Sequence, residues 1–322
     1  MSRQCCNDMG KLAMDRSNST LVEAILKDDL ARGDRALRSV APVISHLLDN
    51  SGPALVTDAI VARLRGMLTD IASQLLQACE PEHLASAKAQ ADIDQLADAL
   101  TSESAVLDHL HTIALEGYLT ERLERQASLD PVLSPMLQEL IASDQPSTAG
   151  LAMKVLAAQS RFMQSQQRMG FAIGELPPEL FLTVLSAAKH SSVIGKIDGA
   201  KRAIKALRKR YDEGTGRLGL LARLMSSLKG GAVAGLNLEH AGLAMFVSAL
   251  AGLAKQPRDL MVLSCHEHQT ARLALALRAA GLEEAAIESQ FVLLGPVERL
   301  PRGIAEIPPE RARDLLCAGG AS

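Results

Sequence analysis

Leu140-Ile-Ala-Ser-Asp-Gln-Pro-Ser-Thr-Ala-Gly-Leu-Ala-Met-Lys-Val-Leu-Ala-Ala158 is the stretch that decides the expected fold. An apolar helix end is followed by a short Asp/Pro turn, and a second helix rich in Leu and Ala begins directly after it. Proline suits the first turn of a helix and Asp favours turns, so this order predicts helix, turn and helix. The rest of the chain repeats apolar residues at steps of three and four. We therefore predict an all-α protein of stacked helix hairpins.

The composition agrees with a helical core that contains few rings. The 322 residues include no Trp, two Tyr and five Phe, while 48% are hydrophobic and 22% are charged. A core of Leu, Ala, Ile, Val and Met suits helices better than strands. The composition excludes a wholly disordered chain and disfavours β-sandwiches and nucleic-acid binders that stack bases on aromatic side chains.

Two segments of the chain are similar to each other. Residues 148–158 and 270–280 share Thr, Ala, Leu, Ala and a closing Ala-Ala, and each follows an apolar helix end and a polar turn. Genuine repetition of a helix hairpin explains this similarity, and so does the high Ala and Leu content alone. The stretch 140–158 resembles the junction of a HEAT-type hairpin, and 28–48 and 262–281 resemble it more loosely. This resemblance implies an irregular HEAT-like solenoid, with a two-lobed helical bundle as the alternative.

The final third of the chain also resembles alphaproteobacterial helical proteins of unknown function, a resemblance that implies no activity. Residues 1–18 are polar without periodicity, which predicts a disordered tail. Thr20 and Glu23 have capping-box spacing, so the first helix is expected to begin there. Glycines and prolines cluster at 170–178, which predicts an N-terminal helical lobe at 19–170 and a C-terminal helical lobe at 178–294. A Pro-containing segment with a short helix is expected at 295–322.

The charge and the cysteines indicate a cytoplasmic protein. A net charge of −3 gives the molecule no overall field that attracts nucleic acid or anionic lipid. The five cysteines are scattered and form no Cys-x-x-Cys pair, which fits a reducing compartment. The first residues lack the apolar region of a signal peptide, and no apolar run reaches the roughly 18 to 20 residues that a membrane span needs.

A basic segment is the strongest functional candidate. Residues 196–210 contain seven cations and one acid, a local charge of +6, so the remainder of the chain carries −9. Helical periodicity places Ile197, Ala200, Ile204, Leu207 and Tyr211 on a buried seam. The outer face then holds Lys201, Arg202, Lys205, Arg208 and Lys209. This face is expected to bind an acidic protein segment, or else nucleic acid or a phosphate ligand. The alternative is a solvated face that balances the acids Asp92, Asp94, Asp98, Glu103 and Asp108.

A second candidate is the cluster Cys265-His266-Glu267-His268. On a helix, Cys265 and His268 share a face and supply two metal ligands, with His240 the nearest third. A metal-dependent enzyme with a site at Cys265, His266 and His268 is therefore an alternative function. The similarity between 148–158 and 270–280 instead places these residues in an inter-helix turn, so no metal is favoured.

The remaining patterns carry no chemistry. Gly214-Thr-Gly-Arg-Leu-Gly219 matches a dinucleotide fingerprint in letters but follows a basic helix instead of a buried strand, which indicates a loop. No nucleophile and base arrangement stands out, so catalysis has no positive support. We expect a non-catalytic helical scaffold with a protein partner and no cofactor; nucleic acid is not favoured, and a homo-oligomer is left open.

Overall fold

The computed structural model describes residues 3–49, 58–82, 86–266, 269–295, 300–301 and 303–319. Within these ranges the chain forms fifteen α-helices and several short 3-10 turns, without a β-strand. This confirms the all-α prediction. The chain divides into two units. One comprises Met1–Arg38, Gly230–Ala241 and Met245–Ser322, and the other comprises Ser39–Lys229 and Gly242–Ala244. We call them unit 1 and unit 2.

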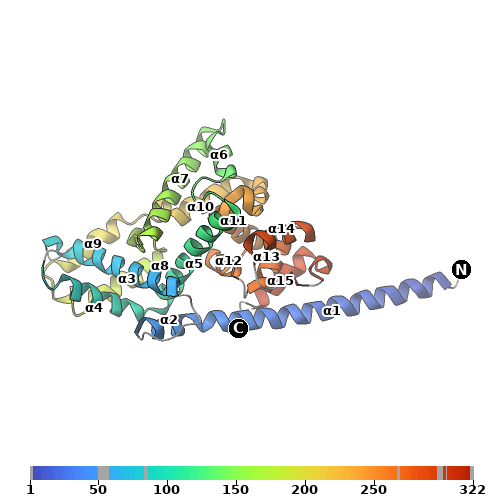
Figure 1. Cartoon of the computed structure of the whole chain (residues 1–322), viewed down its shortest axis with the longest axis horizontal. Coiled ribbons are helices and arrows are strands. Elements are labelled where there is room, and N and C mark those ends of the chain that lie inside the picture. The colour runs from blue at the N-terminus through green and yellow to red at the C-terminus, as the bar shows by residue number, and fades with distance from the viewer. Residues whose placement is uncertain are drawn as a thin grey trace. The chain divides into compact units, whose positions relative to one another are not determined.

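Unit 2 contains nine α-helices (Figure 1). They are α2 (Val40–Asp49), α3 (Asp58–Cys79), α4 (Ala89–Thr101), α5 (Ser104–Ala127), α6 (Pro135–Ile141), α7 (Pro146–Gln167), α8 (Pro178–His190), α9 (Ala200–Arg210) and α10 (Arg217–Ser227). Local sequence sets several of the helix starts. The Ser134 hydroxyl accepts a hydrogen bond from the Leu137 N–H at 3.4 Å, and Pro135, Pro146 and Pro178 each open a helix.

Helix α5 is the centre of unit 2. Most of its residues are buried, and α2, α3, α4, α7 and α8 pack around it. Its buried positions include apolar residues such as Leu110 and Leu119 and also His109, Thr112 and Glu116. A central helix with buried polar groups requires partners for them on its neighbours. Arg217 is such a partner for Glu116.

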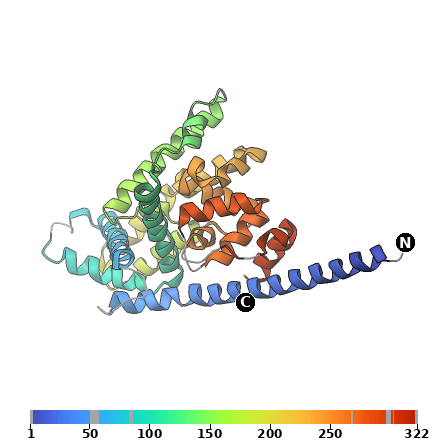
Figure 2. The same ribbon diagram turned by 45° about the vertical axis from the view of Figure 1, so that its right-hand side comes forward.

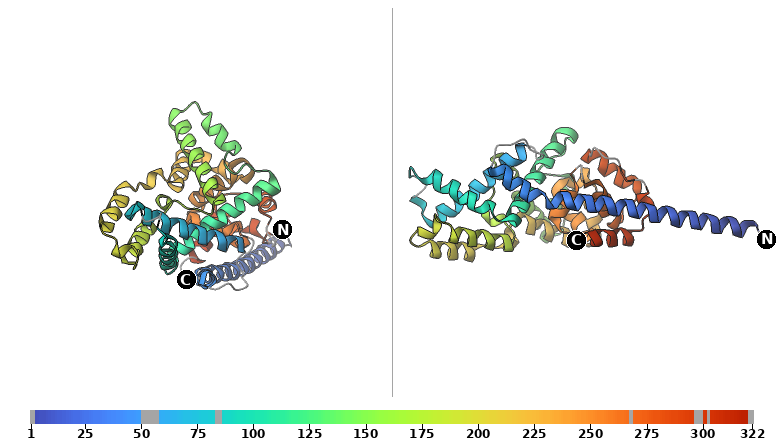
Figure 3. Two further views of the ribbon diagram at one scale, coloured as in Figure 1. Left: turned by 60° about the vertical axis from the view of Figure 1, so that its left-hand side comes forward. Right: turned by 90° about the horizontal axis from the view of Figure 1, so that it is seen from below.

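Unit 1 is organised around α13 (Thr270–Ala279), whose ten residues are all buried. The other members are α1 (Arg3–Arg38), α11 (Leu238–Ala254), α12 (Arg258–Ser264), α14 (Glu284–Leu294) and α15 (Pro309–Gly319). Helix α11 is interrupted at Gly242, where φ is 69°, and residues 242–244 group with unit 2. Helix α1 packs against α13 and α15, and Figure 3 shows it running past α15.

The N-terminus differs from the expectation of a disordered tail at 1–18, because α1 begins at Arg3. Thr20 and Glu23 consequently lie inside a helix and form no capping box at its start. Glu23 has a different role, since its carboxylate accepts hydrogen bonds from Arg311 Nε at 3.0 Å and Nη2 at 2.7 Å. Arg272 pairs with Asp34, and the Gln269 amide donates to the Gly33 carbonyl at 3.1 Å. These contacts hold α1 to unit 1.

The division into units also differs from the expected lobes 19–170 and 178–294. The segment 170–178 lies inside unit 2, because two side chains of α3 bind its backbone. Asp70 Oδ2 accepts the Phe171 N–H at 2.8 Å, and the Gln74 amide bonds the Phe171 carbonyl at 2.9 Å and the Ile173 N–H at 3.0 Å. The cluster of glycines and prolines therefore forms an internal loop of unit 2. The C-terminal segment 295–322 contains α15.

Each of the two similar stretches lies in the second helix of a hairpin. Helices α6 and α7 pack against each other around the turn at 142–145, as Figure 2 shows in green, and α12 packs against α13. The short apolar run Phe291-Val-Leu-Leu294 lies in α14. No single described helix is long and apolar enough to cross a bilayer. One pair, Lys229–Leu236 with Leu238–Ala254, meets the length and composition criteria together but is bent by 118°.

Candidate functional site

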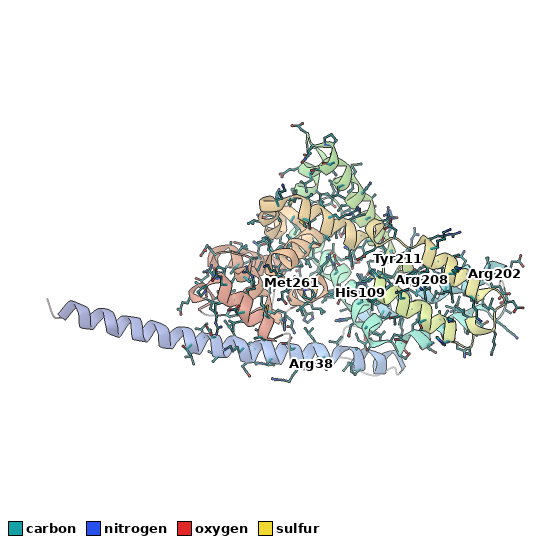
Figure 4. All side chains as sticks on the ribbon, turned by 180° about the vertical axis from the view of Figure 1, so that it is seen from behind. Arg38, His109, Arg202, Arg208, Tyr211 and Met261 are labelled. Atoms are coloured by element: carbon teal, nitrogen blue, oxygen red, sulfur yellow. The ribbon has the colours of Figure 1, made fainter. Side chains whose placement is uncertain are left out.

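Helix α9 carries an exposed basic surface. Lys201, Arg202, Lys205, Arg208 and Lys209 are all exposed, at the positions that the helical period assigned to the outer face. We call these five residues the basic face. Figure 4 labels Arg202 and Arg208 on α9, with Tyr211 directly after the helix. The exposure of these five side chains agrees with the helical period of the sequence.

The opposite side of α9 is buried less deeply than predicted. Ala200 is buried, whereas Ile197, Ile204, Leu207 and Tyr211 are only partly buried. The seam packs toward α3 and α8, and α9 lies at the surface of unit 2. A partly buried seam contributes less hydrophobic free energy than a core helix does, so specific contacts at the helix ends matter more.

Tyr211 anchors the C-terminal end of α9. Its ring stacks on Phe181 with 4.2 Å between centroids and 17° between planes, and its hydroxyl donates to the Leu176 carbonyl at 2.7 Å. Burial raises the pKa of Tyr211, and the carboxylates of Glu213 and Glu179 raise it further. The phenol is therefore held neutral as a hydrogen-bond donor, and its ring is already occupied by Phe181.

The basic face has no fixed anionic partner in the part of the chain that the structure describes. None of its five cations forms an ion pair or a side-chain hydrogen bond there. The acids that could balance it, Asp92, Asp94, Asp98, Glu103 and Asp108, do not pair with it; Asp94, for example, accepts a hydrogen bond from the Gln90 amide at 2.7 Å. The five charges remain available to another molecule.

The helix dipole accounts for only part of this charge. Arg208 and Lys209 lie in the last turn of α9, where cations stabilise a helix. Lys201 and Arg202 lie in the first turn, which contains no acidic residue, and cations there oppose the positive end of the dipole. The stability of α9 therefore does not explain why Lys201 and Arg202 are positively charged.

The interior of unit 2 holds a charged cluster that sequence reasoning did not find. Arg217 Nη1 and Nη2 donate to Glu116 Oε1 and Oε2 at 2.8 and 2.7 Å, and both side chains are almost wholly buried. Arg217 Nη1 also donates to Gln159 Oε1 at 3.1 Å, and the guanidinium carbon lies 3.7 Å from the centre of the Phe162 ring. These contacts join α5, α7 and α10.

A cavity of about 80 Å³ adjoins this cluster, lined in part by Phe162, Phe171 and Arg217. A water molecule occupies about 30 Å³ in the liquid, so the cavity accommodates only very small occupants. Both carboxylate oxygens of Glu116 and both terminal nitrogens of Arg217 have protein partners. The cluster therefore serves to hold the helices together.

The metal candidate is only partly described. Helix α12 ends at Ser264, so Cys265 and His266 follow the helix, while Glu267 and His268 lie outside the described residues. Cys265 is buried, and its thiol donates to the Met261 carbonyl at 3.4 Å. Across the described residues, no three His, Cys, Asp or Glu side chains gather as metal ligands. The glycine sequence at 214–219 comprises a turn at 214–216, in which the Gly214 N–H donates to Asp212 Oδ1 at 2.9 Å, and the first turn of α10 at 217–219.

Comparisons of this chain with protein-family models, with curated proteins and with solved structures found no match. The resemblances to HEAT hairpins and to alphaproteobacterial helical proteins thus gain no support from these comparisons.

Proposed function

We propose that this chain is a non-catalytic helical interaction protein that docks an acidic segment of a protein partner on the basic face of α9. The observation that carries the proposal is the exposure of five cations without an anionic partner in the described chain. Lys201 and Arg202 strengthen it, because their charges are unfavourable for the first turn of the helix that bears them.

The dimensions of α9 favour a short segment as the partner. Its eleven residues correspond to about 16 Å of helix, which matches about five residues of extended chain. A longer polyanion, such as duplex nucleic acid, extends past this helix toward a chain whose remainder carries a net charge of −9. A short acidic peptide avoids that repulsion.

The side chains around α9 favour protein over single-stranded nucleic acid. Binding of single strands commonly relies on aromatic rings that stack on the bases. Tyr211 is the aromatic residue at the end of α9, and both its ring and its hydroxyl already have protein partners. The face consequently offers charge without a stacking platform.

The proposal also covers the two helix hairpins and the cellular location of the protein. We infer that the α6/α7 and α12/α13 hairpins are variants of one HEAT-like unit, since both place a helix of seven residues before a turn and a longer helix. We also infer a cytoplasmic location, which the scattered cysteines support. Among the cysteines whose side chains the structure describes, none forms a disulfide.

Charge reversal on α9 tests the proposal. The probe is a short fluorescent peptide of Asp, Glu and Gly, and its binding is followed by fluorescence anisotropy for the wild type and for Lys205→Glu with Arg208→Glu. We expect the variant to bind at least about tenfold more weakly, because two attractive contacts become repulsive. The matched control is Lys88→Glu with Lys154→Glu, which changes the net charge equally at two exposed positions outside α9.

The control should bind the peptide as the wild type does. Equal weakening in both variants would mean that net charge alone is responsible and would overturn the proposal. Failure of the wild type to bind the acidic peptide any better than an Asn, Gln and Gly peptide would overturn it too. Tighter binding of a single-stranded oligonucleotide of equal charge would reassign the face to nucleic acid.

A further inference from the structure

A second basic site lies in unit 2 between α3, α4 and α7. It is an open groove with a volume of about 700 Å³. Its polar lining includes Arg65, Thr69 and Ser73, which are spaced by four along one face of α3. The lining also includes Arg161 and Gln164 of α7 and Arg168, the C-cap residue that follows α7. Two segments that are distant in sequence therefore present three arginines to one hollow.

The groove has an excess of positive charge. Asp70 is the single carboxylate among its lining residues, and its Oδ2 accepts the Phe171 N–H at 2.8 Å. Arg65 also borders a smaller hollow that contains Asp94 and Asp98. Arg161 and Arg168 are exposed, and neither side chain forms an ion pair or hydrogen bond with another described residue. These two guanidinium groups are the ones available to a ligand.

The wall of the groove is the C-terminal cap of α7, in which the Gly170 N–H donates to the Ser165 carbonyl at 2.8 Å and the Met169 N–H donates to the Gln166 carbonyl at 3.1 Å. Met169 adopts a left-handed backbone with φ of 54°, a conformation that non-glycine residues seldom adopt outside constrained sites. The Ser165 hydroxyl donates to the Gly170 carbonyl at 2.6 Å, and Asp70 and Gln74 hold the following residues.

Gly66 lets α3 approach this wall closely. A Cβ atom at Gly66 would lie 2.5 Å from the Met169 carbonyl oxygen. The arginines of α3 and α7 are therefore carried by a rigid frame, and rigid placement lowers the entropy lost when a ligand binds.

The chemistry of the lining selects a phosphate group. The planar fork of an arginine matches phosphate oxygens with two parallel hydrogen bonds. Thr69, Ser73 and Gln164 add neutral donors, whereas Ile93 and Met169 are its larger apolar members and no aromatic ring is included. The volume falls within the range of about 300 to 1,000 Å³ that is common for small-molecule sites.

We propose that this groove binds a small phosphate-bearing ligand, held by Arg161 and Arg168 with Arg65 opposite. This site is separate from the basic face of α9 and does not depend on the proposed function. The absence of aromatic lining residues disfavours recognition through a stacked base. The phosphate group itself is thus the recognised part of the ligand.

Calorimetric titration with inorganic pyrophosphate tests this site in the full chain. We expect saturable binding with a Kd below about 1 mM for the wild type. Arg161→Gln with Arg168→Gln should bind at least about tenfold more weakly, because two charge-assisted contacts are lost. The matched control is Arg125→Gln with Lys154→Gln, which removes two exposed cations from α5 and α7 outside the groove and should bind as the wild type does. Circular dichroism establishes that each variant remains helical.

Several results would overturn the inference. The first is no saturable pyrophosphate binding by the wild type, and the second is equal weakening in the groove variant and its control. The third is loss of pyrophosphate binding in Lys205→Glu with Arg208→Glu, which would place the anion site on α9. Citrate titrated in parallel separates phosphate recognition from general anion binding, and equally tight citrate binding would contradict the assignment to phosphate. If an unfolded variant obscures the comparison, single Arg168→Lys, which keeps the charge but removes the planar fork, should still weaken pyrophosphate binding.

Discussion

Glu116 on α5 and Arg217 on α10 form a two-pronged ion pair in the interior of unit 2, with oxygen to nitrogen distances of 2.8 and 2.7 Å and exposed fractions of 0% and 3%. The pair joins segments that are 101 residues apart in sequence. Removal of one partner leaves the other charge buried, whereas removal of both leaves none. This asymmetry makes unit 2 sensitive to the loss of either partner alone.

We expect Glu116→Gln to lower the free energy of unfolding by about 3 to 5 kcal/mol, because the guanidinium of Arg217 then remains buried without a countercharge. The double variant Glu116→Leu with Arg217→Met should lower the free energy of unfolding by less than Glu116→Gln alone does, because the double variant leaves no charged group in the interior. Urea unfolding followed by circular dichroism measures both. A loss below about 1 kcal/mol for Glu116→Gln would mean that the pair is open to water.

Two helical glycines should respond oppositely to alanine. At Gly66 a Cβ would lie 2.5 Å from a backbone oxygen of Met169, while at Gly150 it would meet no atom within 4 Å. Gly150→Ala should stabilise the protein by up to about 1 kcal/mol through helix propensity. Gly66→Ala should destabilise it, because α3 and the 168–170 loop must separate. Thermal unfolding of the two variants gives the comparison, and stabilisation by Gly66→Ala would contradict the close approach.

The raised pKa of Tyr211 predicts how the stability of the protein changes at high pH. The folded-state pKa of Tyr211 is raised by burial and by nearby carboxylates, so its neutral form is favoured in the folded protein. The resulting stability is fully present below the unfolded-state pKa of about 10 and is lost as the pH rises from there through the folded-state pKa. Tyr211→Phe should therefore remove a late step from the tyrosinate absorbance titration. It should also show a smaller loss of stability at high pH than the wild type.

Features set by residues close together in sequence could be predicted, whereas features set by contacts between distant residues could not. The basic face of α9 depends on helical period alone, so it was located residue by residue. The depth of its seam was overestimated, because the burial of Leu207 depends on how closely α3 and α8 approach. The predicted capping box at Thr20 was wrong, because Thr and Glu at this spacing also occur inside helices. Glu23 lies inside α1 and accepts a hydrogen bond from Arg311.

The interior polar contacts and the arginine groove had no local signal. Glu116 and Arg217 are each unremarkable in sequence, and only the packing of α5 against its neighbours brings them together. Arg161 in α7 and Arg168 directly after α7 are close in sequence, but Arg65 on α3 joins them only through the fold. The 170–178 cluster suggested a boundary because glycine and proline mark loops, yet Asp70 and Gln74 bind that loop to α3.

The salt dependence of acidic-peptide binding tests the basic face of α9 most directly. Between about 0.1 M and about 1 M ionic strength the screening length falls from about 10 Å to about 3 Å. We predict that the wild type loses at least about tenfold in affinity over this range, while Lys205→Glu with Arg208→Glu starts weak and changes little. Wild-type binding that is independent of salt, or a charge-reversed variant with the affinity and the salt dependence of the wild type, would contradict the account.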